Sequence, residues 1–98
     1  IEVMSLIKIS YKVRIIGKVQ GVWFRGWAKN QANKYEITGW IRNRKDGSVE
    51  AVISGSEDNV QEMLGALKIG PPSAKVTSIH STPCNPPYEG RFLQLVTA

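Results

Sequence analysis

Apolar and polar residues follow two different periods in the first half of the chain. Residues 11–15 alternate between apolar and basic side chains, which predicts a half-buried strand that ends near Gly17. Residues 23–35 then carry apolar side chains at helical spacing, which predicts an amphipathic helix. Strands are predicted again over 37–43 and 48–55, and because an Asp-Gly turn lies between them, the two form a hairpin.

The second half of the chain repeats the order of helix and strand. Ser56 is a favourable N-cap residue, and the two acidic residues after it suit the first turn of a helix. This helix is predicted to end at Gly70, which two prolines follow. Residues 74–79 predict a fourth strand, whose break in alternation indicates a β-bulge. A proline-rich loop over 82–90 precedes a fifth strand around 93–95.

The predicted elements fit one fold class. Two strand–helix units around a central hairpin predict an α+β fold, a ferredoxin-like two-layer sandwich. An antiparallel sheet in βαββαβ order plus a terminal strand would carry both helices on one face. The 98 residues suit a single domain over 1–98, in which about residues 1–7 are expected to form a disordered N-terminal extension.

Composition and charge narrow the classes of partner. The chain has 13 Lys and Arg against 8 Asp and Glu, and this net charge of +5 favours phosphate esters, acidic metabolites or nucleic acid. No apolar run approaches the roughly 20 residues that span a bilayer, so no membrane partner is expected. The single cysteine excludes an intrachain disulfide and favours a cytoplasmic location.

The usual catalytic side chains are scarce. His80 and Cys84 are the only residues of their types, so no zinc-type ligand spacing exists, and neither a metal nor a cofactor is expected. His80 is interpreted as a surface or hydrogen-bonded structural residue. Cys84 lies in a proline-rich loop without a basic helix terminus nearby, which does not favour a thiolate nucleophile. An enzyme built from this chain works without an obvious nucleophile, general acid or metal.

A glycine-edged loop joins the first strand to the first helix. Such a loop directs several backbone N–H groups at one point, which suits an anion. Arg25 in the first helical turn adds a fixed charge whose planar guanidinium can hold two phosphate oxygens. The residues also permit the alternative that Gly17 and Gly21 only shape a tight turn while the Arg25 side chain is solvated.

The loop residues, together with a second segment, resemble the acylphosphatase family. The first signature is Gly17-x-Val19-Gln20-Gly21-Val22-x-Phe24-Arg25, and the second is Gly39-Trp40-Ile41-Arg42-Asn43 with Gly47, Val49 and Gly55 downstream. The similarity extends over roughly residues 11–95. The departures are a large side chain at Trp23, Glu36 where the family commonly has glycine, and Ile41 where it more often has Val or Ala. None of them removes a catalytic position.

The resemblance implies hydrolysis of the mixed anhydride of a carboxylic acid and phosphate, with a small acyl phosphate as substrate. It implies that Arg25 and the loop amides hold the phosphoryl group and that Asn43 orients the attacking water. The implied phosphate-binding residues are Val19, Gln20, Gly21, Val22, Trp23, Phe24 and Arg25. Inorganic phosphate or sulfate would compete for them. A monomer is expected.

Two of these residues keep open alternatives. Asn43 shares a face of its strand with Ile37 and Ile41, and that face is predicted to meet the helices. By spacing alone, Asn43 is equally well a turn residue that enters the hairpin loop. Trp23 could border the acyl side of the site, pack in the core or lie on the surface.

The alternative function is a non-catalytic phosphate- or RNA-binding ferredoxin-like module. RNA-recognition domains share this order of strands and helices and stack bases on aromatic side chains of the sheet. The predicted strand over 48–55 has no aromatic residue, so a nucleic-acid partner is not expected.

Overall fold

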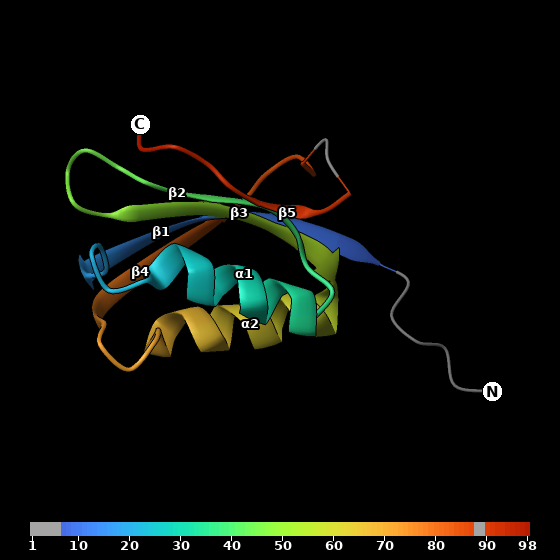
Figure 1. Cartoon of the computed structure of the whole chain (residues 1–98). Coiled ribbons are helices and arrows are strands. Elements are labelled where there is room, and N and C mark those ends of the chain that lie inside the picture. The colour runs from blue at the N-terminus through green and yellow to red at the C-terminus, as the bar shows by residue number, and fades with distance from the viewer. Residues whose placement is uncertain (1–6, 88–89) are drawn as a thin grey trace.

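The computed structural model describes residues 7–87 and 90–98, so the extension expected at about residues 1–7 lies outside the described residues except for Ile7. The described residues form two helices and five strands (Figure 1). In chain order they are β1 (Lys8–Lys18), α1 (Phe24–Lys34), β2 (Thr38–Asn43), β3 (Val49–Ser56), α2 (Glu57–Ile69), β4 (Lys75–Pro83) and β5 (Phe92–Gln94). This order confirms the prediction from sequence.

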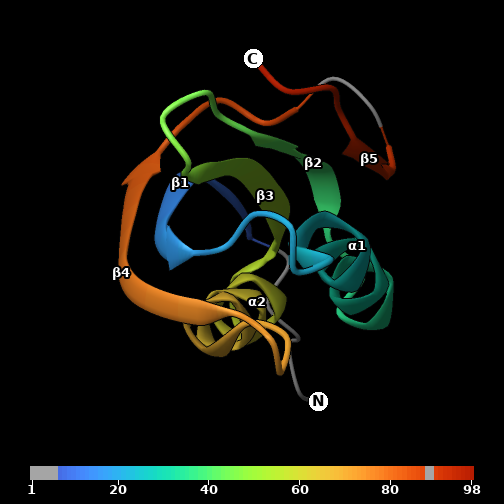
Figure 2. The same cartoon turned by 60° about the vertical axis from the view of Figure 1, so that its left-hand side comes forward.

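The sheet has the strand order β4-β1-β3-β2-β5. Neighbouring strands are antiparallel except β2 and β5, which are parallel, so the expectation of a wholly antiparallel sheet was wrong at this edge. The reason is the path of the chain. After β4 it crosses to the opposite edge of the sheet along the end at which β4 finishes (Figure 2), so β5 runs opposite to β4 and therefore along β2.

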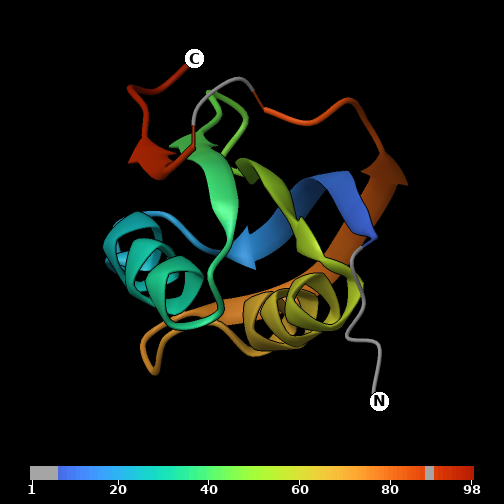
Figure 3. The same ribbon diagram turned by 90° about the vertical axis from the view of Figure 1, so that its right-hand side faces the viewer.

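Both helices cover the same face of the sheet, as predicted (Figure 3). The core between the two layers contains the alternate residues of the strands and one side of each helix, which confirms both hydrophobic periods. Its fully buried side chains include Val13, Ile15, Phe24, Ala28, Ala32, Ile41, Val49, Ala51, Ile53, Val60, Met63 and Leu67.

The bulge expected in the fourth strand is present. Ile16 pairs with Ser78 and Gly17 with Val76, so Thr77 is the extra residue on β4. Gly17 has φ +136°, and a Cβ there would stand 2.2 Å from the carbonyl oxygen of Lys75. A side chain therefore cannot be accommodated at the point where β1 turns into the loop before α1.

Glu36 ends the first helix in the left-handed conformation, with φ 54°. The next amide, Ile37 N–H, donates to the carbonyl of Ala32 at 2.8 Å and closes the helix. Because a side chain costs about 1 kcal/mol relative to glycine in this conformation, Glu36→Gly should raise the melting temperature by a few degrees without changing turnover. Thermal unfolding followed by circular dichroism measures this.

A matched control separates this backbone effect from the loss of a charge. Glu62 is an exposed glutamate inside α2, where glycine is unfavourable, so Glu62→Gly should lower the melting temperature. A lower melting temperature for Glu36→Gly as well would contradict the backbone argument.

Candidate phosphate-binding site

A cavity of about 400 Å³ lies where β1, β2 and β5 end and α1 begins. Figure 2 brings this end of the sheet forward, with the loop before α1 and the β2–β3 hairpin both at it. The cavity is lined by Val19, Gln20, Gly21, Trp23, Phe24, Arg25, Gly26, Asn43, Gln94, Leu95 and Val96. Segments far apart in sequence therefore meet at one concave surface.

The cavity brings together most of the residues that the sequence singled out. Arg25, Asn43 and the loop residues before Arg25 line it, whereas Val22 does not and instead packs partly buried against the core. Phe24 and Val19 are buried at 2% and 1% exposure, so they contribute backbone rather than side chain to any ligand contact.

The N-terminus of α1 lacks the capping seen at α2. Ser56 caps α2 by accepting a hydrogen bond from the Asn59 amide at 3.2 Å, and acidic residues occupy that helix's first turn. At α1 the N-cap residue is Trp23, which makes no side-chain cap, and no acidic residue lies in the first turn. The amides of α1 and the positive end of its dipole therefore face the cavity without an internal anion.

Arg25 is held at the cavity by the segment that follows β5. Its Nη1 donates to the carbonyl oxygen of Leu95 at 3.2 Å. The Leu95 amide donates in turn to Ile41 of β2 at 2.8 Å, so the position of that carbonyl is set by the sheet. A guanidinium has five N–H donors in a fixed plane, and this one bond orients it for a further anionic partner.

Asn43 is the last residue of β2 and lines the same cavity. Its backbone oxygen accepts from the Ala98 amide at 3.0 Å, and its strand neighbour is Val49 of β3. The buried residues Ile37 and Ile41 lie on the helix-facing side of the sheet, which confirms the predicted face for Asn43. An amide side chain there can both donate and accept hydrogen bonds.

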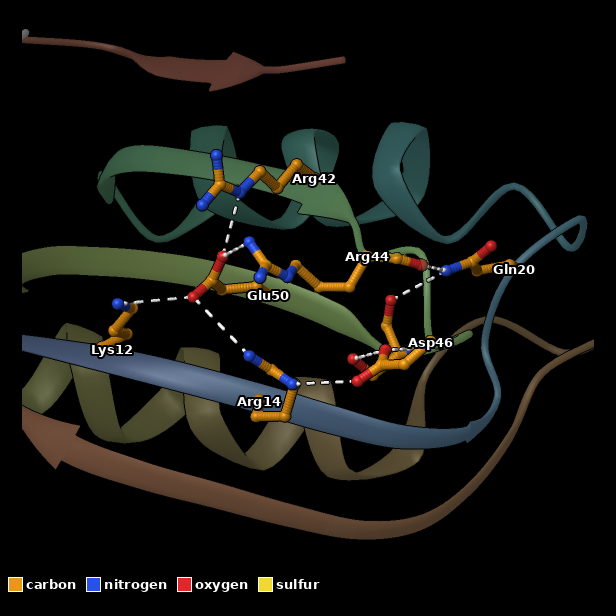
Figure 4. A network of polar contacts seen from close by, with 8 residues as sticks. Lys12, Arg14, Gln20, Arg42, Arg44, Asp46 and Glu50 are labelled. Atoms are coloured by element: carbon orange, nitrogen blue, oxygen red, sulfur yellow. Dashed lines mark hydrogen bonds and ion pairs between the residues drawn. The ribbon is translucent and has the colours of Figure 1, made fainter. Parts of the chain in front are cut away.

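The side chain of Gln20 fastens the loop to the hairpin. Its Nε2 donates to the carbonyl oxygens of Arg44 at 2.7 Å and Ser48 at 2.8 Å (Figure 4). These carbonyls belong to the turn directly after Asn43, so Gln20 fixes the distance between the loop and that residue. This contact could not be predicted from the sequence, because a glutamine in a loop is compatible with many partners.

The same hairpin is held on the other face of the sheet by a buried carboxylate. Glu50 has a side chain only 4% exposed and lies within 4.0 Å of four cationic side chains (Figure 4). These are Lys12, Arg14, Arg42 and Arg44. Burial alone raises the pKa of Glu50, but the hydrogen bond and charge of Arg42, followed by those of Lys12, outweigh it, so the pKa lies below its ordinary value of 4.5.

The buried carboxylate of Glu50 should make the free energy of unfolding depend on pH. A carboxyl whose pKa is lower in the folded state stabilises the fold above its unfolded pKa and loses this as the pH falls through the folded value. Glu50→Gln should therefore lower the free energy of unfolding at pH 7 by about 1–2 kcal/mol, a value reduced because the cations are partly exposed. Urea unfolding of both proteins at pH 7 and pH 3 measures this change in the free energy of unfolding.

The difference between the parent and Glu50→Gln should shrink at pH 3, where the carboxyl becomes protonated. Glu62→Gln, which removes an exposed charge from α2, serves as the control and should show little difference at either pH. An equal loss for Glu50→Gln at both values would contradict the assignment.

His80 and Cys84 lie away from the cavity. His80 is on β4, at the opposite edge of the sheet from β5. The Cys84 amide donates to Ser10 near the start of β1, whereas the cavity lies at its other end. Burial raises the pKa of the Cys84 thiol despite the nearby charge of Lys12. The raised pKa disfavours the thiolate form.

Two further features of the described residues bear on function. Across 7–87 and 90–98, no three His, Cys, Asp or Glu side chains gather closely enough to hold a metal ion. Neither helix in this part of the chain has the length and apolar character needed to cross a membrane.

The cavity-lining residues at the end of β5 and directly after it could not be recognised from the sequence. Gln94, Leu95 and Val96 carry no distinctive chemistry, and only the parallel pairing of β5 with β2 places them beside Arg25. Gly26 was missed for a similar reason, since a glycine inside a helix shows no periodicity.

Comparison with known proteins gives a consistent result. The profile of the acylphosphatase family matches residues 11–93. A protein from Rhodospirillum rubrum named acylphosphatase is 50% identical over 82 residues, covering 84% of this chain and 90% of the relative. An acylphosphatase structure from Coxiella burnetii has a TM-score of 0.86 at 31% identity, covering 90% of this chain and 93% of that one. The crystal structure of acylphosphatase from Bacillus subtilis has a TM-score of 0.84 at 36% identity, covering 89% and 98%.

Proposed function

The chain belongs to the acylphosphatase family, and we propose that it hydrolyses acyl phosphates in the cavity between the loop before α1 and the end of β2. The products are a carboxylate and inorganic phosphate. Arg25 and the backbone amides of residues 19–25 bind the phosphoryl group, and Asn43 orients the attacking water. The observation that carries this assignment is the uncapped N-terminus of α1, which faces the same cavity as Arg25 and Asn43.

The reaction suits the few functional groups at the site. Water attacks phosphorus, the bond from phosphorus to the bridging oxygen breaks, and the carboxylate leaves with the electron pair. Because a carboxylic acid has a pKa near ~4, this leaving group needs no proton from a general acid. The proton of the water passes to a phosphoryl oxygen of the substrate itself. No histidine or carboxylate is then required as a base.

Positioning and charge supply the catalysis. Phosphoryl transfer passes through a loose transition state with charge spread over the equatorial oxygens, which suits a cradle of N–H donors. Arg25, oriented by the carbonyl of Leu95, adds a permanent positive charge to that cradle. Gln20 ties this cradle to the turn after Asn43, so the phosphoryl group and the water are held in one geometry.

Release of phosphate from synthetic benzoyl phosphate by the purified protein tests the proposal. Hydrolysis well above the spontaneous rate, with inorganic phosphate as a competitive inhibitor, is expected. Absence of turnover in a folded preparation would contradict it and favour a non-catalytic phosphate-binding module.

Turnover should be independent of metals and of His80 and Cys84, which lie outside the cavity. A chelator, His80→Ala and Cys84→Ala should each leave activity near that of the parent, because the proposed chemistry uses none of them. Steady-state hydrolysis of benzoyl phosphate measures all three. A tenfold loss in any of these tests would overturn the mechanism as written.

The proposal also covers the cellular location and the oligomeric state of the enzyme. A cytoplasmic location is supported by the free thiol of Cys84, which suits a reducing compartment. We further propose that residues 1–98 form one catalytic domain that acts as a monomer, since the loop, Arg25 and Asn43 all come from one chain.

A further inference from the structure

The cavity contains an apolar part that phosphoryl chemistry does not use. Trp23 and Val96 are 67% and 84% exposed, and both line this cavity. Leu95 lines it as well. The volume of about 400 Å³ is much larger than one phosphoryl group and falls within the range of pockets that hold small organic ligands. The apolar lining is therefore available to the other half of an acyl phosphate.

The indole of Trp23 has a defined place beside the phosphate loop. A Cβ built at Gly26 would stand 2.3 Å from Nε1 and 2.5 Å from Cε2 of Trp23. The ring therefore packs directly on the backbone of α1, next to Arg25, in space that any side chain at residue 26 would take. An exposed tryptophan is in this way held at the cavity rather than turned freely into solvent.

Folding does not account for a large side chain at this position. Trp23 has φ 63°, a conformation that favours glycine or asparagine over a bulky residue. It also lies outside the set of described apolar residues that form the core or pack against it. A tryptophan here is thus unfavourable for the backbone and adds little to the core, which points to a contact with a ligand.

We propose that Trp23 binds the acyl group of the substrate and makes flat, aromatic acyl phosphates the preferred class. The inference rests on the proposed function, because the phosphoryl group must occupy the loop and Arg25 for the acyl group to reach the indole. Stacking of an aromatic ring on an indole adds favourable contact that a methyl group cannot supply. Trp23 thus acts as a specificity-determining residue, while Arg25 and Asn43 carry the phosphoryl transfer.

The test compares benzoyl phosphate with acetyl phosphate. The ratio of their kcat/KM values is measured for the parent, Trp23→Gly and Trp23→Phe, so the intrinsic reactivity of each compound cancels between proteins. Trp23→Gly suits the left-handed backbone and should fold, and its ratio should fall about tenfold. Trp23→Phe should keep most of the ratio. Inhibition by phenylphosphonate against methylphosphonate gives the same comparison without turnover.

Two further variants sharpen the result. Gly26→Ala keeps the tryptophan but displaces its ring, so the ratio should fall although no aromatic group is lost. Ile69→Ala removes another exposed apolar side chain, 77% exposed and outside the cavity, and should leave the ratio unchanged. Hydrolysis of both compounds with the same ratio in the parent and Trp23→Gly would overturn the inference alone. Hydrolysis of neither would overturn the proposed function and this inference together.

Discussion

Replacing Arg25 by alanine is expected to lower kcat/KM for an acyl phosphate by about 1,000-fold and to weaken phosphate binding in parallel. The guanidinium would contact the phosphoryl group both in the bound substrate and in the transition state, so binding and rate are lost together. Arg25→Lys keeps the positive charge but loses the planar pair of donors, and about a 100-fold loss is expected. Steady-state kinetics and calorimetric titration with phosphate measure the two effects.

A control must separate this loss from a change in net charge. Lys29 is an exposed cation on the same helix, so Lys29→Ala removes one positive charge without touching the cavity. It should stay within about twofold of the parent at moderate ionic strength. Near-normal kcat/KM in Arg25→Lys would show that a point charge is sufficient and that the planar geometry is not used.

Asn43→Ala is expected to lower kcat by about 100-fold, because the attacking water loses the group that orients it. Substrate affinity should change little, since a water molecule contributes little to binding of the phosphoryl group. The variant must be folded, which amide spectra can verify, because β2 also pairs with β3 and with the chain after β5. Asn33→Ala, an exposed asparagine on α1, is the matched control. Near-normal turnover in folded Asn43→Ala would exclude the proposed role.

Most of the fold was predictable because each element has an independent local signal. The strands show alternation, the helices show helical spacing, and Ser56 and Gly70 fix the ends of α2 as expected. The left-handed conformation of Glu36 agrees with the resemblance to a family that commonly has glycine at that position. The direction of β5 had no such signal, because a three-residue strand after a long loop contains no information on which neighbour it joins.

The candidate site was only partly predictable for a related reason. A loop that ends in a helix N-terminus and an arginine can be recognised along the chain, and so can an asparagine at the end of a strand. Contacts between segments that lie far apart in the chain cannot be recognised in this way. The bond from Arg25 to Leu95 and those from Gln20 to the hairpin depend on tertiary placement. Of the three places that the sequence left open for Trp23, the structure excludes the core, because the side chain is exposed and lines the cavity.

The proposed phosphate site is tested most directly by titrating inorganic phosphate into the parent, Arg25→Lys and Asn43→Ala and following the backbone amides by NMR. Phosphate should shift the amides of residues 19–26 in the parent, and Asn43→Ala should bind it almost as tightly. Arg25→Lys should bind it far more weakly. Amide shifts confined to other parts of the chain would contradict the placement of the site. Equal loss of affinity in both variants would instead make Asn43 a phosphate ligand and end the proposed division of roles.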